Sequence, residues 1–473
     1  MLTRETAGDI FDCIKKLSSS DEVEVLFSGG RFALTRFANN TIHQNVAEEN
    51  YVVSVRSVFG GRTARAFTNK FDDESLRQVV RSAESLAKVQ HPDADLLPMP
   101  DSAEAAGSSG EGRTGESPVP TRDVPSRHFL TTAGITPELR ADGVKKIVGV
   151  AEKHGLTTAG VFSSGDSFEG IFNSRGLSNW HTQTSAEVSI TMLASDSSGW
   201  QKANSPDVGR LDPLRLAEVA AKKALDSARP REIPAGKCTV ILEPAAVLDI
   251  VGFMFWDFAG MAILDQRSFL SGRMGTHLFG DNITILDDVA HPLQTGCPFD
   301  GEGVQRQRVG LVENGIVKRV VYARATAERM KRSEFKDQAG PTAATGHGFA
   351  LPNEMGEMPQ NIVFASVGDP QTVEQMIAST ERGVLVTRLW YIREVEPFEK
   401  MLTGMTRDGT FYVENGRVVG GVRNFRFNES LIHMLSHVEA MSVPVRASGE
   451  ESFDMVVPAM KVGEFNFTEV TKF

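Results

Sequence analysis

The chain contains only three cysteines among its 473 residues, and no two of them form a Cys-x-x-C pair. Cysteines this few and this widely spaced exclude a disulfide framework and a zinc ribbon. The sequence also lacks an apolar run long enough to span a bilayer, because Asp249 and Asp257 interrupt its most apolar region, residues 245–264. Residues 1–17 contain no continuous apolar signal core. We therefore expect a cytoplasmic protein that does not contact membranes.

An excess of basic charge is also absent. The chain carries 50 lysines and arginines against 61 aspartates and glutamates, which gives a net charge of −11. Binding to phosphate backbones requires a basic surface, so we expect no direct contact with nucleic acid.

The length of the chain exceeds what one hydrophobic core usually supports, so two or more domains are expected. Residues 101–127 contain no aromatic residue and no Leu, Ile or Met. Such a segment cannot bury enough apolar surface to offset the entropy of ordering it, which predicts a flexible linker. We therefore expect an amino-terminal domain in two halves, residues 1–100 and 128–236, followed by a carboxyl-terminal domain at 237–473.

A weak internal repeat links the two halves of the amino-terminal domain. Residues 37–55 align with residues 172–190 at a constant offset of 135, which pairs Phe37 with Phe172. In each copy, alternating apolar residues are followed by a glycine-containing turn and then by a helical pattern. We interpret this as an α/β domain built from a duplicated ββα unit. The alternative is a chance match between two ordinary ββα segments.

The carboxyl-terminal region is rich in short β-type runs. Asn314-Gly315 and Asn415-Gly416 each lie within the tetrapeptide Val-Glu-Asn-Gly, between two apolar segments. Asn-Gly tolerates the positive φ angles of a type I′ turn and therefore predicts a β-hairpin at both places. The expected fold class is α+β, with a β-rich carboxyl-terminal domain of antiparallel hairpins. Ser28-Gly29-Gly30 lacks the Walker lysine pattern and does not indicate a phosphate-binding loop.

Two histidines spaced four residues apart suggest a zinc-binding helix within residues 427–441. Glu429, His433 and His437 would share one face of such a helix, opposite an apolar stripe, with Asn428 as the N-cap. Two histidines and a glutamate are suitable zinc ligands. However, a face opposite the core is normally solvated and lacks the buried supporting groups of a catalytic zinc site. We therefore favour a solvated surface over a metal site.

Other polar residues offer weaker candidates. His347 lies in a loop rich in glycine and proline and has no evident partner group, so an ordinary loop histidine is favoured over a binding residue. Asp300 and Glu302 form an acidic turn, which more often bonds to its own backbone than to a cation. Cys297 has no neighbouring base and is not proposed as a nucleophile.

Residues 388–393 alternate basic and apolar side chains, as expected for a half-exposed strand. A glycine-rich turn is expected shortly afterwards. Candidate substrate-binding residues on this strand and turn are Arg393, Thr403, Thr406, Arg407 and Asp408. They would line a peptide groove or, equally, stabilise the turn itself.

Several long motifs resemble the carboxyl-terminal domain of the TldD/PmbA family. They are SFLSGRMGTHLF (268–279), CPFDGEGVQRQRVGLVENGIVKRVVYARATAERM (297–330), PTAATGHGFALPN (341–353), ERGVLVTRLWYIREVEP (381–397) and LTGMTRDGTFYVENGRVVGGVRNFRFNES (402–430). Residues 36–70 resemble that family's first domain. The resemblance covers most of the chain except the linker.

The resemblance implies a cytosolic zinc metalloprotease that acts on unfolded or small peptides, typically as a heterodimer of a TldD-type and a TldE-type (PmbA) subunit. In the TldD-type subunit, a helix with the motif H-E-x-x-x-H supplies two zinc ligands. The corresponding helix here spans residues 245–266 and contains no histidine. Phenylalanine and tryptophan occupy the expected ligand positions. We therefore expect no metal ligand and no catalytic residue in this chain, with zinc held by the partner.

The chain thus most resembles the metal-free TldE/PmbA-type subunit, and its expected partners are a TldD-type subunit and unfolded or small peptides. Two alternatives stay open. One is an independent metallohydrolase with atypical ligands such as Glu429, His433 and His437. The other is a non-enzymatic peptide-binding or regulatory protein, in line with the family's older description as a modulator of DNA gyrase.

Overall fold

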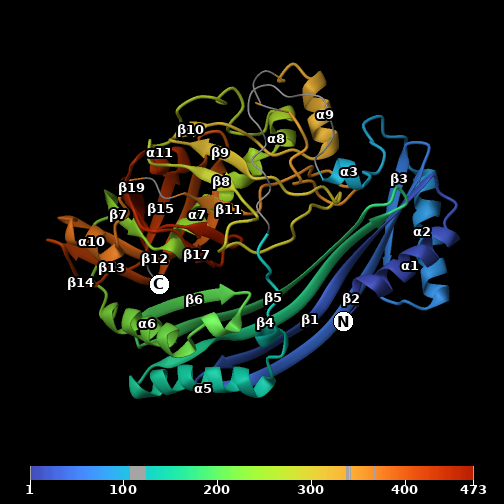
Figure 1. The fold of residues 1–473 in the computed structure, drawn as a ribbon. Coiled ribbons are helices and arrows are strands. Elements are labelled where there is room, and N and C mark those ends of the chain that lie inside the picture. The colour runs from blue at the N-terminus through green and yellow to red at the C-terminus, as the bar shows by residue number, and fades with distance from the viewer. Residues whose placement is uncertain (1, 107–123, 337–339, 341, 366–367, 472–473) are drawn as a thin grey trace.

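A computed structural model of the chain describes residues 2–106, 124–336, 340, 342–365 and 368–471. Its amino-terminal and carboxyl-terminal domains pack against each other, the first built on one large sheet and the second on two (Figure 1).

The amino-terminal domain consists of a six-stranded antiparallel sheet with the strand order β3-β2-β1-β4-β5-β6. Its elements are α1 (Arg4–Leu17), β1 (Glu22–Ala38), β2 (Thr41–Phe59), β3 (Arg62–Thr68), α2 (Asp73–Val89), α3 (Ser102–Ala105), α4 (Leu130–Ala133), α5 (Pro137–Lys153), β4 (Thr157–Asn173), β5 (Ser178–Leu193), β6 (Ser198–Ser205), η1 (Val208–Arg210) and α6 (Pro213–Asp226). The central strands β1 and β4 pair along almost their whole lengths.

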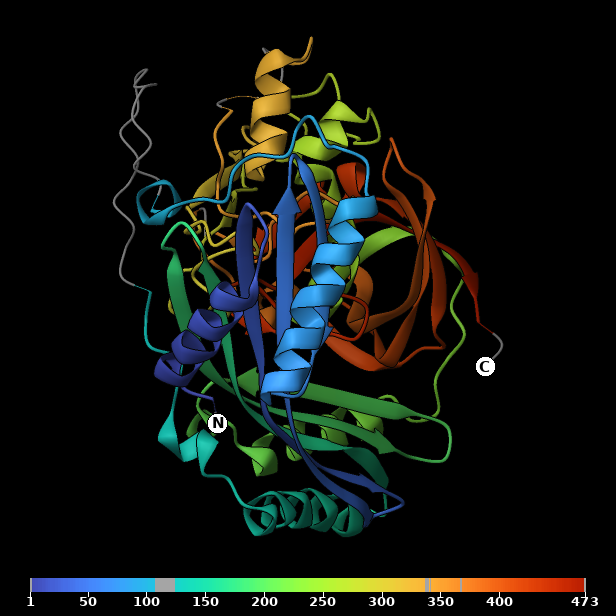
Figure 2. The same cartoon turned by 90° about the vertical axis from the view of Figure 1, so that its right-hand side faces the viewer.

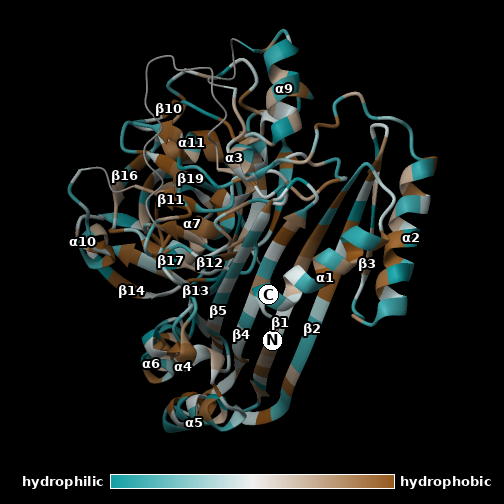
Figure 3. Ribbon diagram, turned by 45° about the vertical axis from the view of Figure 1, so that its right-hand side comes forward, coloured by the Kyte–Doolittle hydropathy of each residue, from teal (hydrophilic) through white to brown (hydrophobic). Residues whose placement is uncertain are grey.

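The long helices of this domain are amphipathic and begin at strong caps. In α2, the side chain of Asp72 accepts a hydrogen bond from the N–H of Ser75, and one face buries Leu76, Val79 and Val80. Hydrophobic residues lie on the side of α2 that faces the sheet, and hydrophilic residues lie on its outward side (Figure 3). Packing of this apolar face holds the helix in place.

All four long helices cover the same face of the sheet. Residues of odd number on β1 point toward them, since Val25 packs with α1 and α2 and Phe37 packs with α5 and α6. Leu26, on the opposite face, packs against a cluster that includes Cys297 and Phe299 of the carboxyl-terminal domain. Figure 2 shows α1 and α2 in front of the strands and the carboxyl-terminal domain behind them. The helix-free face therefore meets the second domain.

The two halves of the amino-terminal domain have the same order of long elements. Helix α1 with three strands and α2 is followed by α5 with three strands and α6. The expected offset of 135 residues carries the bounds of β1, 22–38, onto those of β4, 157–173. The repeated unit is thus larger than the expected ββα unit, because it includes an additional helix and strand. Its origin by duplication stays a prediction.

Most of the expected linker, residues 107–123, lies outside the described part of the chain. Its first residues form the short helix α3, capped by Asp101 and Glu104 in a reciprocal capping box. At its end, Arg127 is buried and its Nη1 donates a hydrogen bond of 3.0 Å to the carbonyl of Gly296. Both described ends of the linker therefore pack against folded structure.

The carboxyl-terminal domain contains two further sheets. Its elements are β7 (Gly236–Leu242), α7 (Pro244–Val251), η2 (Gly252–Phe258), α8 (Gly260–Leu264), β8 (Ile285–Asp287), β9 (Val309–Glu313), β10 (Ile316–Val317), α9 (Arg324–Arg332), β11 (Ile362–Phe364), α10 (Val373–Ala378), β12 (Arg382–Glu396), β13 (Met401–Glu414), β14 (Arg417–Gly421), β15 (Phe425–Ser430), α11 (Leu431–Ser436), β16 (Val438–Met441), β17 (Val445–Ala447), β18 (Met455–Val457) and β19 (Met460–Val470). Most pairings are antiparallel, so the expected α+β class is confirmed.

One of these sheets closes on itself. Strands β12, β7, β19, β15 and β13 pair in this order, and β12 also pairs with β13. The ring surrounds part of the main hydrophobic core of the domain. The other sheet has the order β10-β9-β8-β11-β18-β17 and packs on the same core.

Both predicted Asn-Gly hairpins are confirmed. Asn314 and Gly315 connect β9 to β10 with φ angles of 46° and 76°. Asn415 and Gly416 connect β13 to β14 with φ angles of 50° and 76°. Positive φ at both central residues is the geometry of a type I′ turn.

The expected single helix over residues 245–266 is wrong, because the structure divides it into α7, η2 and α8. The segment is apolar on nearly every side, and its burial in the domain core decides its path instead of helical periodicity. Phe255 and Phe258 are fully buried there, whereas Trp256 is partly exposed. Among the described residues, no helix combines the length and apolar character needed to cross a membrane.

Candidate functional site

A cleft of about 940 Å³ lies between the two domains. Its amino-terminal wall is formed by residues from β1 (26–32), β2 (48–54) and β4 (165–170). Its carboxyl-terminal wall is formed by loop residues 299–301 and 348–350. A volume of this size between domains is typical of ligand-binding sites, which makes the cleft the leading candidate for a functional site.

Two glycines let the strands pass closely where they line the cleft. A Cβ atom at Gly29 would lie 2.2 Å from the carbonyl oxygen of Asn50, and one at Gly30 would lie 2.1 Å from that of Asp166. Both glycines are paired within β1, so Ser28-Gly29-Gly30 belongs to a strand and not to a phosphate-binding loop. Close backbone approach explains why glycine occupies both positions.

Arg306 lines the cleft and has one buried guanidinium nitrogen without a hydrogen-bond partner among the described residues. Its Nε donates to the carbonyl of Cys297 at 3.2 Å, and its Nη2 donates to Oε1 of Gln360 at 2.7 Å. The buried Nη1 has no hydrogen-bond partner within the described chain. Buried guanidinium nitrogens are rarely left unpaired, so this atom makes Arg306 an unusual residue of the cleft wall.

The acidic turn beside Arg306 is committed to the backbone, as expected. Oδ1 of Asp300 accepts hydrogen bonds of 2.9 Å from the N–H groups of Glu302 and Val304, and Oδ2 accepts one of 2.8 Å from Gly348. Burial raises the pKa of both Asp300 and Glu302. The carboxylates therefore shape the loop wall and do not form an open cation site.

Arg65 fixes the two walls of the cleft relative to each other. Its Nε donates a hydrogen bond of 2.7 Å to the carbonyl of Leu351, across the domain interface. Its Nη2 lies 2.6 Å from Oε1 of the buried Glu24, which also lies 3.3 Å from Nε of Arg56. A buried, charge-assisted bridge of this kind holds the strand wall against the loop wall.

A second buried polar centre lies on α7. Oδ1 of Asp249 accepts hydrogen bonds of 3.0 Å from the N–H groups of both Glu450 and Glu451. Burial raises the pKa of Asp249 to about 7. A Cβ atom at Gly449 would lie 2.2 Å from the same oxygen, so residues 449–451 pack directly over the carboxylate.

Comparison with known proteins places the chain in a family. Three family models, described as domain 1, the central domain and the C-terminal domain of the PmbA/TldA metallopeptidases, match residues 23–87, 134–228 and 235–469. The chain belongs to the TldD/PmbA family.

Relatives and solved structures agree with this assignment. The metalloprotease PmbA of Escherichia coli O157:H7 is 21% identical over 354 residues, which cover 72% of this chain and 73% of that protein. The fold resembles the crystal structure of TldE from Thermococcus kodakarensis, with a TM-score of 0.80, 18% identity and coverage of 98% and 100% of the two chains. A putative modulator of DNA gyrase from Thermotoga maritima MSB8 has a TM-score of 0.81, with 19% identity and the same coverage.

The residues of α7, η2 and α8 do not fit the zinc that the TldD/PmbA family implies at this segment. The segment offers only two potential ligands, Asp249 and Asp257, and no histidine. Asp249 is covered by the backbone of residues 449–451, and Asp257 forms an ion pair of 2.5 Å with the buried Lys400. Zinc would need three or four converging nitrogen, sulfur or oxygen donors, which this segment does not provide.

The expected turn around Thr403–Asp408 is wrong, because these residues lie within the long strand β13. Met401 to Glu414 pair with β12 along most of their length, and this pairing extends the strand through the glycine-rich stretch. Gly409 accommodates a φ of 119°, and Asp408 itself has a φ of 54°. The glycine therefore permits an irregularity within a strand instead of ending it.

The five candidate substrate-binding residues divide between surface and interior. Arg393 is exposed and pairs in register with the half-buried Thr403, and Arg407 is also exposed. Thr406 and Asp408 are buried. Contact of any of these residues with a substrate stays a prediction, and none of them lines the interdomain cleft.

The two buried candidates, Thr406 and Asp408, interact with other residues of the protein. Oγ1 of Thr406 accepts a hydrogen bond of 3.0 Å from the N–H of Phe425. Asp408 forms an ion pair with Arg388, which is itself buried and stacks on Trp200 and Trp390. Residues 388–393 lie in a half-exposed strand, as expected, but Arg388 itself is buried because the amino-terminal domain covers this part of β12.

The expected helix over residues 427–441 is also wrong. Strand β15 continues to Ser430, which caps the short helix α11, and β16 begins at Val438. Pairing of β15 with β13 and β19 overrides the helical periodicity of the apolar residues. Glu429 is therefore buried in a strand, and the expected N-cap Asn428 lies before the helix within β15.

His347 occupies a loop, as expected, but its ring is buried. Its Nε2 lies 3.1 Å from Oδ1 of Asp287, and its Nδ1 lies 3.0 Å from Oγ1 of Thr345. Burial opposes ionisation of Asp287, but the interactions with His347, Arg306 and the N–H of Asn361 together outweigh it, and the pKa of Asp287 is lowered. His347 thus has a partner that the sequence did not indicate.

Arg65 and Arg306, the polar residues that define the cleft, were not identified from the sequence. The bridge from Arg65 to Leu351 joins positions 286 residues apart. No local pattern marks either arginine, and only the packing of the two domains brings them to one cavity. The glycine pair at positions 29 and 30 was the one local signal of this wall.

Proposed function

We propose that this chain is a TldE/PmbA-type subunit of a heterodimeric zinc metalloprotease, in which a TldD-type partner holds the catalytic zinc. The observation that carries the proposal is the segment α7–η2–α8. Its position corresponds to the zinc-bearing helix of a TldD-type subunit, yet it contains no histidine, and Asp249 is covered by the backbone of residues 449–451. Hydrolytic activity then requires a second polypeptide, because no ligand set for a catalytic metal exists at this place.

The interdomain cleft supports the proposal that the protein binds unfolded or small peptides. The proposed location of this activity is the cytoplasm. Glu48, Asn50 and Val52 of β2 line it. Along residues 41–52, β2 pairs with β1 on one side, while β3 pairs only from Val53 onward. An extended peptide adding to this edge would gain main-chain hydrogen bonds, which give affinity with little demand on sequence.

Reconstitution tests this function. The chain, a TldD-type protein from the same organism and their mixture are each incubated with an unfolded polypeptide and with short peptides. We expect cleavage only in the mixture, loss of cleavage with a chelator and recovery with added zinc. Peptidase activity of this chain alone would overturn the proposal, as would a mixture no more active than the partner alone.

A further inference from the structure

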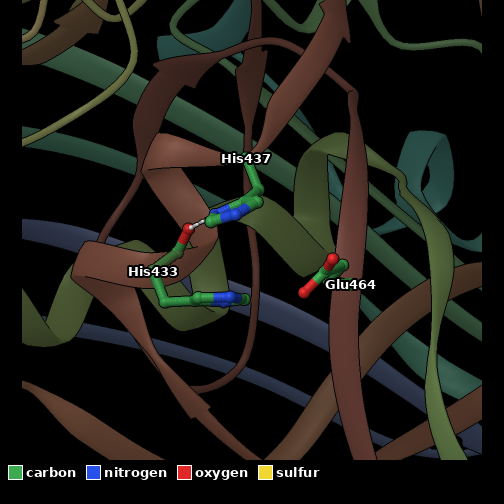
Figure 4. A group of neighbouring side chains, drawn as sticks. All are labelled: His433, His437 and Glu464. Atoms are coloured by element: carbon green, nitrogen blue, oxygen red, sulfur yellow. Dashed lines mark hydrogen bonds between the residues drawn. The ribbon is translucent and has the colours of Figure 1, made fainter.

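Three ligating side chains converge on the surface of the carboxyl-terminal domain, outside the cleft. His433 belongs to α11, His437 is the C-cap of that helix, and Glu464 lies on β19 (Figure 4). One ligand atom from each lies within 4.8 Å of the other two. His433 is half-buried, and His437 and Glu464 are exposed.

Each histidine has its Nδ1 engaged by an oxygen atom. Nδ1 of His433 lies 2.8 Å from Oε1 of Glu429, and Nδ1 of His437 lies 2.8 Å from the carbonyl oxygen of His433. A carbonyl or carboxylate oxygen accepts a hydrogen bond, so Nδ1 carries the N–H in both rings. The lone pair of each neutral ring is then on Nε2, where it is free to bind a metal.

Glu429 is a buried supporting group for His433, which a site on a solvated helical face would lack. If residues 427–441 formed one regular helix, Glu429 would lie on the same solvated face as the two histidines. It would then not be a buried group that could hold a histidine ring in place. In the structure Glu429 is 3% exposed, and its Oε2 accepts a hydrogen bond of 2.7 Å from the N–H of Asn466. A buried carboxylate that orients a histidine ring is the supporting group of many zinc sites.

The backbone of β19 also departs from regular geometry at the third ligand. Glu464 has a φ of 55°, and the register between β19 and β7 shifts between Val462 and Phe465. A left-handed conformation in a residue other than glycine is energetically unfavourable and often marks a functional position. The only ion pair of Glu464 within the described chain is an exposed contact of 3.2 Å with Lys237, which contributes little stability.

We propose that His433, His437 and Glu464 form a binding site for a transition-metal dication such as zinc, with Glu429 as the residue that positions His433. Two imidazole nitrogens and a carboxylate favour zinc, cobalt and related metals over magnesium and calcium. With metal–nitrogen bonds of about 2.0–2.1 Å in a tetrahedral site, ligand atoms lie roughly 3.3 Å apart, so these atoms must approach one another by up to roughly 1.5 Å. Solvent-exposed side chains make such a movement readily, and water would complete the coordination.

Such a site would connect α11 to β19 and stabilise the domain. It is separate from the α7–η2–α8 segment and does not line the cleft, so it adds no catalytic step to the proposed function. Its presence is measured on this chain alone. A negative result would therefore leave the heterodimer proposal unaffected, and a failed reconstitution would leave the metal site unaffected.

Metal binding to the isolated full chain tests the proposal. After chelator treatment and dialysis, zinc is titrated by calorimetry, and Co²⁺ is titrated by visible absorption. We expect one equivalent to bind, with the intense spectrum of four-coordinate Co²⁺, and excess Mg²⁺ or Ca²⁺ not to compete. His437→Ala and Glu464→Gln should weaken zinc binding at least tenfold. Absence of binding at micromolar zinc, or competition by Mg²⁺, would overturn the assignment.

A matched control and a positioning variant sharpen the test. His277, which forms an exposed contact of 2.7 Å with Asp281, is a surface histidine paired to a carboxylate, but it belongs to no group of three ligands among the described residues. His277→Ala should bind zinc like the unaltered chain; equal losses in all variants would contradict the site. Glu429→Gln should lower zinc affinity about 10–100-fold and shift the Co²⁺ spectrum. A purely structural Glu429 would change only the melting temperature in chelator.

Discussion

Nε of Arg388 donates a hydrogen bond of 2.8 Å to Oδ2 of Asp408, and both side chains are buried. The guanidinium lies 4.8 Å from the ring centre of Trp200, and Oδ1 of Asp408 accepts a hydrogen bond of 2.6 Å from Oγ of Ser198. Trp200 and Ser198 belong to β6 of the amino-terminal domain. This ion pair therefore links β12 and β13 to the other domain.

Removing the anion of this pair should destabilise the protein. Asp408→Asn leaves the charge of Arg388 buried without compensation, which costs about 3–5 kcal/mol. Asparagine tolerates the φ of 54° at this position, so the backbone is not the cause of the loss. Urea denaturation measures the change. Asp281→Asn, at an exposed carboxylate, is the control and should change stability little; equal effects of the two substitutions would contradict the structural role of Asp408.

The buried carboxyl group of Asp249 should make stability depend on pH. Its pKa is about 7 in the folded chain against 3.8 for the ordinary side chain, and burial is the main cause. Because the folded state binds the proton more tightly, the stability contribution of Asp249 is highest below about pH 4 and falls until about pH 7. The three-unit difference corresponds to a loss of at most about 4 kcal/mol.

Asp249→Asn isolates this effect. The amide oxygen can still accept hydrogen bonds from Glu450 and Glu451, but no ionisation occurs. Relative to the unaltered chain, the variant should gain stability between pH 4 and pH 8 by up to about 4 kcal/mol. Urea unfolding at several pH values measures the difference. Parallel pH profiles for the two proteins would show that Asp249 ionises as freely in the folded chain as in the unfolded one.

The hairpin at Asn314-Gly315 should be sensitive to a side chain at the glycine. A Cβ atom at Gly315 would lie 2.3 Å from the carbonyl oxygen of Phe279, in addition to the strain of its φ of 76°. Gly60 has a φ of 52° but open space around it. Gly60→Ala should cost about 1 kcal/mol from backbone conformation, and Gly315→Ala about 1–3 kcal/mol more. Thermal unfolding of both variants measures this; identical melting temperatures would contradict it.

The cleft should bind peptides partly through Phe32, an apolar side chain on its wall that is 43% exposed. Phe32→Ala should weaken binding of a fluorescently labelled unfolded peptide about 3–10-fold, as for a moderate interface residue. Phe398 is 47% exposed and does not line the cleft, so Phe398→Ala is the matched control. Fluorescence anisotropy gives both affinities, and a larger loss in the control would place the peptide elsewhere.

Local sequence patterns predicted some secondary-structure elements correctly and others wrongly. Asn314 and Asn415 predicted their hairpins correctly, because positive φ angles depend on the residues of the turn alone. The apolar stripe at residues 427–441 predicted a helix that the structure replaces with β15, α11 and β16. The helical spacing of these apolar residues was overridden by the pairing of β15 with β13 and β19, whose residues lie elsewhere in the chain.

The sequence by itself determined the family, the α+β class and the lack of histidine ligands in the segment at residues 245–266, since these depend only on which residues occur and in what order. Tertiary structure alone decided that Arg65 and Arg306 line one cleft and that Glu464 lies beside His433 and His437. The physical reason is distance along the chain. Side chains separated by tens or hundreds of residues share a site only after long-range packing has positioned their backbones.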